Sequence, residues 1–119
     1  MAAPNIVNVS TILGKTAVQQ VGASATAIVT NSAASGKVFK INSLIVSNVD
    51  GTNAADITVD LFRSSTAYEI ASTISVPADA SLVVISKETA IYLEEGDSIR
   101  LTASATGDLE ALCSYEEIS

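Results

Sequence analysis

Asp56-Ile57-Thr58-Val59-Asp60-Leu61 is the stretch of sequence that decides the fold. Its three apolar residues, Ile57, Val59 and Leu61, alternate with polar ones. Successive side chains of a strand point to opposite faces, so this alternation indicates one buried and one hydrated face. An amphipathic helix would instead repeat its apolar residues every three or four positions. The stretch therefore predicts a β-strand that covers one side of a core.

Segments with the same character recur on both sides of this stretch. Alternation of period two is seen in Ala67–Val76, Ser98–Ser104 and Leu109–Glu116. Shorter runs rich in Val, Ile and Thr also predict strands, at Ile6–Ile12, Ala25–Asn31, Lys37–Asn48, Ser81–Ser86 and Ile91–Leu93. We expect the long run Lys37–Asn48 to bend and to be buried on both faces around Leu44-Ile45-Val46.

Turn residues and composition agree with an all-β chain. The 119 residues include 12 Val, 12 Ile and 11 Thr, and these β-branched side chains favour pleated strands over helices. Turn clusters separate the predicted strands at Ser35-Gly36, Asn48–Asn53, Pro77–Asp79, Glu95–Asp97 and Thr106–Asp108. We predict a single antiparallel β-sandwich of about eight strands over residues 1–119, jelly-roll or immunoglobulin-like, with no helix longer than two turns.

The alternating strands also predict which residues form the core. We expect a core that contains Ile57, Val59, Leu61, Ile99, Leu101, Leu109, Ala111 and Cys113. Cys113 is the single cysteine, and its place on the apolar face of a strand favours a small core residue over a reactive thiol.

Several classes of function are disfavoured by composition. The chain has no histidine and one cysteine, which argues against Zn sites of the His/Cys type and against Ser-His-Asp or Cys-His catalysis. Its net charge of −7 repels nucleic acid and anionic lipid. No apolar run approaches the length of about 18 residues needed to span a bilayer. We expect a non-enzymatic protein with no cofactor, no metal and no nucleic-acid or membrane partner.

Acidic residues offer the nearest approach to a catalytic or metal site. Glu94, Glu95 and Asp97 could bind calcium, and Glu94 with Glu69 could form a glycosidase pair. A polar turn at Glu94-Glu95-Gly96-Asp97 is the simpler interpretation. Asp56 and Asp60 are expected on a solvated strand face. Glu116-Glu117 is expected to be a charged, hydrated end of the chain.

Five residues are candidates for an interface. Phe62 lies on the polar face of its strand, so it is either covered by another element or exposed at a contact. The bases Lys37, Lys40 and Arg63, with Lys15, are candidates for contacts with an acidic partner. Two lysines around Phe39 do not make a nucleic-acid patch on so acidic a chain.

Sequence stretches across the whole chain resemble a known family. They are MAAPNIVNVSTI (Met1–Ile12), GKVFKINSLIVSNVDGTNAADITV (Gly36–Val59), AYEIASTISVPADASLVVI (Ala67–Ile85), IYLEEGDSIRLTAS (Ile91–Ser104) and LEALCSYEEIS (Leu109–Ser119). Together they resemble the small virion structural proteins of marine T4-like tailed phages, the cyanophages. This resemblance carries no catalytic residues over to the chain.

The resemblance implies a protein made in the host cytoplasm and assembled into the virion. We expect a capsid decoration (cement) protein that associates with itself, in trimers by analogy, and docks on the major capsid protein. The absence of heptads and fibrous repeats disfavours a fibre shaft. The alternative is a tail, neck or fibre accessory module that binds a receptor or carbohydrate. In either case, the N-terminal segment Met1–Val9 is expected to reach a neighbouring subunit.

Overall fold

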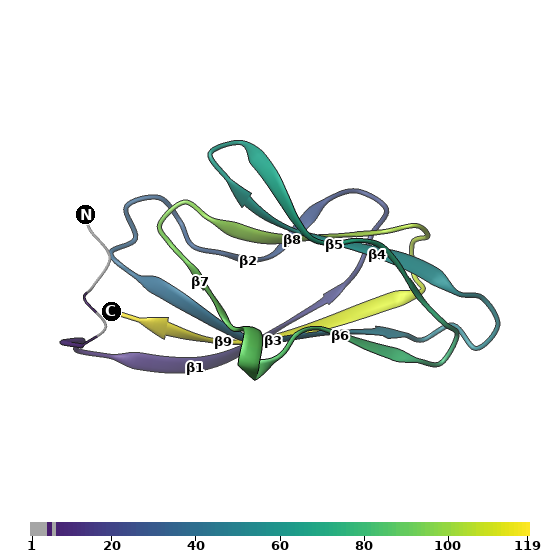
Figure 1. Cartoon of the computed structure of the whole chain (residues 1–119), viewed down its shortest axis with the longest axis horizontal. Coiled ribbons are helices and arrows are strands. Elements are labelled where there is room, and N and C mark those ends of the chain that lie inside the picture. Colours follow the sequence, from purple (N-terminus) through teal and green to yellow (C-terminus); the bar gives the residue numbers. More distant parts are fainter. Residues whose placement is uncertain (1–4, 6) are drawn as a thin grey trace.

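The computed structural model describes Asn5 and residues 7–119. These residues form nine strands in two antiparallel sheets that pack face to face, which confirms the predicted all-β sandwich (Figure 1). The strands are β1 (Ile12–Gln20), β2 (Thr26–Thr30), β3 (Val38–Asn48), β4 (Ala55–Arg63), β5 (Thr66–Val76), β6 (Ser81–Ile85), β7 (Ile91–Leu93), β8 (Ser98–Ala103) and β9 (Leu109–Ile118). A single turn of 3-10 helix, η1 (Lys87–Thr89), lies between β6 and β7.

Strand order decides between the two sandwich topologies. Sheet A has the order β1-β9-β3-β6, with β7 also paired to β3, and sheet B has the order β2-β8-β4-β5. The first half of the chain therefore pairs with the second half as one long antiparallel ribbon that is rolled over on itself. This is the double-sheet arrangement of a jelly roll. Ser64 and Ser65 form the tip of the ribbon, both with positive φ, as a tight two-residue hairpin turn requires.

The core lies between the two sheets and is mainly aliphatic. Seven of the eight predicted core residues are buried, and the eighth, Leu61, is partly buried and packs against the same cluster. The largest fully buried side chains include Ile41, Leu44, Ile57, Ile99 and Leu101. Phe39 adds an aromatic contact, because its ring stacks on Tyr115 with 5.4 Å between centroids.

The first predicted strand, Ile6–Ile12, is wrong. Asn5 instead starts a turn, in which its side-chain Oδ1 accepts a hydrogen bond from the Val7 N–H and its carbonyl accepts one from the Asn8 N–H. Ile6 lies outside the described residues. The first strand begins only at Ile12 and continues to Gln20.

Burial also differs from expectation in two strands. β3 is not buried on both faces: Leu44 and Val46 point into the core, whereas Ile45 points outward and is partly exposed. β5 is exposed over most of its length, and Val76 is its one residue classed as buried. Two shifts in its register with β4 interrupt the alternation, and β5 is an edge strand with one neighbour.

Candidate interaction surface

A row of aliphatic side chains crosses the outer face of sheet A. Val18 of β1 lies opposite Leu112 of β9, which in turn lies opposite Ile45 of β3. Ile45 also lies opposite Val83 of β6. Directly paired residues of an antiparallel sheet project on the same side, so the four form one continuous apolar row. They are exposed by 72, 44, 37 and 57%, respectively.

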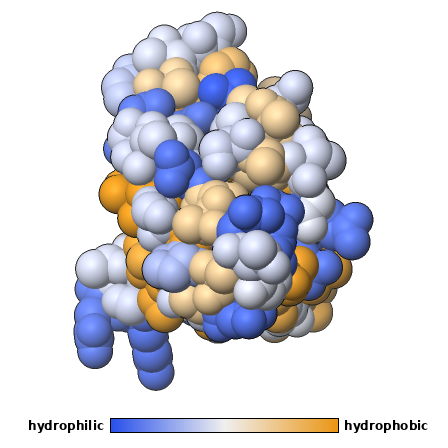
Figure 2. All heavy atoms as spheres, turned by 90° about the vertical axis from the view of Figure 1, so that its right-hand side faces the viewer, coloured by the Kyte–Doolittle hydropathy of each residue, from blue (hydrophilic) through white to orange (hydrophobic). Residues whose placement is uncertain are grey.

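Polar residues flank the apolar row on both sides. Thr16 and Ser114, whose hydroxyls lie 3.4 Å apart, form one border, and Gln20, Glu110 and Ser47 form the other. Viewed from one end, most of the strongly hydrophobic residues lie in the middle and lower part of the molecule, interspersed with hydrophilic ones (Figure 2). An apolar strip with a polar rim is the usual arrangement of a protein–protein contact.

The outer face of sheet B is polar and already internally paired. Asp60 is buried rather than solvated, and it accepts hydrogen bonds from Arg100 Nε at 2.9 Å and Nη2 at 3.2 Å. The Arg100 guanidinium lies 3.9 Å from the centre of the Phe62 ring. Phe62 is therefore half-buried with the Arg100 side chain over its ring, and its role at an interface stays a prediction.

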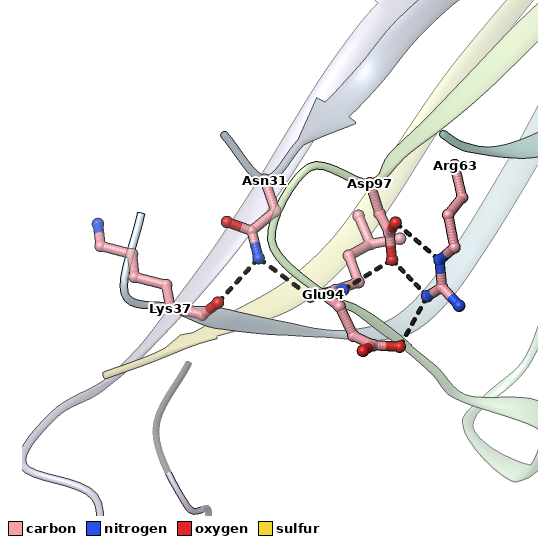
Figure 3. A network of polar contacts seen from close by, with 6 residues as sticks. Asn31, Lys37, Arg63, Glu94 and Asp97 are labelled. Atoms are coloured by element: carbon pink, nitrogen blue, oxygen red, sulfur yellow. Dashed lines mark hydrogen bonds and ion pairs between the residues drawn. The ribbon is translucent and has the colours of Figure 1, made fainter. Parts of the chain in front are cut away.

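Arg63 is held by two acids of the loop after β7 (Figure 3). Its Nε and Nη2 donate to Asp97 Oδ1 and Oδ2 at 2.8 and 2.5 Å, and Nη2 also donates to Glu94 at 2.8 Å. Burial alone would raise the pKa of Asp97, but the hydrogen bonds from Arg63 and from the Glu94 N–H outweigh it and lower that pKa. The loop is the predicted turn, and it fastens β4 of sheet B to the end of β7 in sheet A.

Asn31 fixes the same loop from its other side. Its side-chain NH₂ donates to the carbonyl oxygens of Lys37 and Leu93, and its backbone pairs with Asp97 and Gly96 (Figure 3). Asn31 is fully buried, and nothing in its sequence neighbourhood distinguished it from an ordinary turn residue. These contacts make the acidic loop a structural joint between the sheets.

Lys37 and Lys15 meet at Glu117, near the end of β9. The Glu117 carboxylate lies 3.1 Å from Lys37 Nζ and 2.8 Å from Lys15 Nζ. The hydrogen bond from Lys15 lowers the pKa of Glu117, and Lys37 adds to this effect. Together they outweigh burial, which alone would raise the pKa. Glu117 is thus a buried strand residue and not part of a hydrated tail. Lys40 lies opposite Glu116 and Tyr92 on the outer face of sheet A.

The surface does not assemble the catalytic or calcium site considered from sequence. A hollow of about 330 Å³ opens beside β1 and β9, and its lining holds one carboxylate, that of Glu110. Glu94 is bound to Arg63, and Glu69 lies opposite Asp60 on sheet B. Among the described residues, no group of three or more Asp, Glu or Cys side chains is arranged to hold a metal ion.

The exposed aromatic residues do not form a shared platform. Tyr68 lies on β5 of sheet B and Tyr92 on β7 of sheet A, whereas Phe39 and Tyr115 stack on each other. Stacking of a sugar needs aromatic faces gathered in one place. Over Asn5 and residues 7–119, the structure also contains no helix long and apolar enough to cross a membrane.

Cys113 is the predicted core residue, and its chemistry follows from its burial. The side chain is fully buried on β9, and burial raises the pKa of its thiol to about 12. A thiol reagent attacks the thiolate, so Cys113 is expected to resist it at pH 8 in folded protein and to react fully in denaturant. Ellman's reagent measures both states. Rapid labelling of the folded protein would contradict the burial of this residue.

Comparisons with known proteins find the fold but no family. No family model matches the chain, and no curated protein matches it. A similar solved structure is described as "Bacillus endospore appendages form a novel family of disulfide-linked pili". That chain is 15% identical with a TM-score of 0.54, and the match covers 100% of this chain and 96% of the other. The two chains share a fold. Function does not follow from fold at this identity.

Proposed function

We propose that this chain is a non-enzymatic structural protein of a phage particle, in which it associates with itself and decorates the capsid shell. The apolar row on the outer face of sheet A carries the proposal. The four side chains of the row point away from the core and stay partly exposed, whereas many other aliphatic side chains are buried. They belong to Val18, Leu112, Ile45 and Val83. Such a row is stabilised when a partner covers it.

The fold and the known neighbour support a structural role. The neighbouring structure is described as that of pili, which are assemblies of many subunits. Its disulfide linkage does not carry over, because the single cysteine of this chain is buried inside the sandwich. Copies of this protein therefore associate by non-covalent contacts. We propose a phage particle as the assembly because the sequence resembles virion proteins of cyanophages.

The capsid is the proposed docking partner. Small one-domain proteins that coat a finished shell need a surface for the shell and a surface for each other, and a jelly roll provides two sheet faces and four edges. The bound face is expected to be the outer face of sheet A. The outer face of sheet B, with Asp60 and Arg100 already paired, is expected to remain hydrated.

Labelled particles test this proposal. Phage particles that carry a gold-labelled copy of the protein are expected to show label over the whole head in electron micrographs. Leu112→Glu, on the apolar row, is expected to abolish incorporation, because an isolated carboxylate is expensive to bury at a contact. Thr102→Glu, on the outer face of sheet B, is the matched control and should incorporate normally.

Each alternative has its own outcome. Label on the tail or neck alone would overturn the decoration role and favour the accessory module. A protein that stays monomeric at all concentrations and is absent from purified particles would overturn the structural role itself.

A further inference from the structure

β1 is an edge strand without the usual protection against pairing. It pairs with β9 over nine residues in one unbroken register, it contains no proline, and its one charged residue, Lys15, is ion-paired with Glu117 of β9. The other long edge strand, β5, carries Glu69 and two shifts of register. β2 has five residues and its own register shift. Bulges, charges and short length are the features that keep sheet edges from joining, so β1 is the edge most open to a further strand.

Backbone hydrogen bonds show which residues of β1 face the free edge. Thr11 bonds to Ser119, and the Val21 N–H donates to the Leu109 carbonyl. Because bonded pairs alternate along an antiparallel ladder, the odd-numbered residues of β1 bond to β9. The N–H and C=O groups of the even-numbered residues therefore point away from sheet A. Val18 is one of these, and its side chain lies in the apolar row.

β6, at the other edge of sheet A, is as short as β2 and also has one register shift, but unlike β2 it carries a residue of the apolar row and presents the matching geometry. The Asn48 N–H donates to the Ala80 carbonyl, and the β3–β6 register continues from there to Ile45 opposite Val83. By the same alternation, Val83 directs its N–H and C=O to the free edge. Val83 also lies in the apolar row. β1 and β6 run in opposite directions within sheet A, so β1 of one copy beside β6 of another makes an antiparallel pair.

Charge does not oppose a contact between these two edges. β6 carries no charged residue, and the one charge of β1, Lys15, already lies 2.8 Å from its partner Glu117. The charged neighbours of β6 in the sequence are of both signs, Asp79, Lys87 and Glu88. Pairing of β1 with β6 therefore places no unpaired charge of either strand in the contact.

We infer that copies of this chain associate head to tail, with β1 of one copy hydrogen-bonded antiparallel to β6 of the next and with Val18 opposite Val83. This deepens the proposed self-association and rests on it. The apolar row then continues unbroken from copy to copy on one face. A contact between two different edges closes into a ring or extends as a filament, depending on the rotation at each step.

Site-specific disulfide formation between copies tests the geometry. Residues in a bonded antiparallel pair have Cα atoms about 5.5 Å apart, which suits a disulfide. An equimolar mixture of two full-length variants, Val18→Cys and Val83→Cys, is expected to form a covalent dimer under mild oxidation, and the buried Cys113 does not compete. Each variant alone should form little. The double variant should give a ladder of higher oligomers on a non-reducing gel.

The controls separate this inference from the proposed function. Val49→Cys replaces Val83→Cys in the control mixture, because Val49 is exposed on the β3–β4 loop, away from both edges. Dimer yield about tenfold above this control supports head-to-tail pairing. Efficient dimers of Val18→Cys alone would instead show β1 paired with β1 and overturn it. Yield equal to the control, while the protein still labels phage heads, overturns the pairing but leaves the structural role in place.

Discussion

Arg63→Met is expected to lower the free energy of unfolding by about 3 kcal/mol, because it leaves a buried carboxylate without its partner. The Asp97 side chain is 2% exposed and receives both its side-chain hydrogen bonds from Arg63. The value lies at the lower end of the range for a broken buried ion pair, because Arg63 itself is partly exposed and the Glu94 N–H still donates to Asp97. Urea denaturation followed by circular dichroism measures the loss.

The same variant is expected to change the response to pH. In the natural protein, the pKa of Asp97 lies below its ordinary value of 3.8, so its stabilising contribution is complete above that value and is lost as pH falls through the lowered pKa. Without Arg63, burial dominates and raises this pKa, so the folded variant is relatively more stable when Asp97 is protonated. The difference in the free energy of unfolding between the natural protein and Arg63→Met should therefore be large at pH 7 and small at pH 3.

Lys87→Met is the matched control for charge. Lys87 is exposed in η1 and makes no ion pair within the described part of the chain. Its replacement should alter the unfolding free energy by no more than about 0.5 kcal/mol. The ion pair of Arg63 with Asp97 would not stabilise the fold as we expect if Arg63→Met were as stable as Lys87→Met. The same would follow if the loss of stability in Arg63→Met did not depend on pH.

Leu44→Ala and Ile45→Ala are expected to differ sharply although the residues are neighbours in β3. Leu44 is fully buried between the sheets, so its truncation is expected to lower stability by about 3 kcal/mol, the usual loss for a buried leucine. Ile45 lies in the apolar row, and its truncation should lower stability by no more than about 1 kcal/mol. The two midpoints of thermal or urea unfolding provide the comparison.

Incorporation into particles should be weakened more by Ile45→Ala than by Leu44→Ala, the reverse of their expected effects on stability. Ile45→Ala removes apolar surface from the proposed contact, so we expect about tenfold weaker incorporation into particles, which corresponds to about 1.4 kcal/mol. Folded Leu44→Ala protein retains the apolar row and should incorporate normally at a temperature where it is fully folded. Equal stability losses for the two variants would show that both faces of β3 are buried after all.

Alternation in the sequence determined much of the fold, because a strand with one buried and one hydrated face has alternating apolar and polar residues. Ile57, Leu101 and Leu109 were placed in the core from this pattern alone, and each is fully buried. The turn at residues 94–97 and the buried state of Cys113 followed in the same way. These are local properties, fixed by the period of two and by turn chemistry.

Tertiary structure alone decided whatever depends on partners distant in sequence. β1 has no alternation of its own, since an edge strand of this kind is held mainly by the backbone ladder to β9, a hundred residues away in places. Glu117 was expected in a hydrated end of the chain, but the fold places it beside Lys15 and Lys37. Asp60 was expected on a solvated face, but the fold places Arg100 beside it. The apolar row likewise exists only because four strands are placed in register. Its residues are single apolar positions in the sequence, and strand pairing makes them a surface.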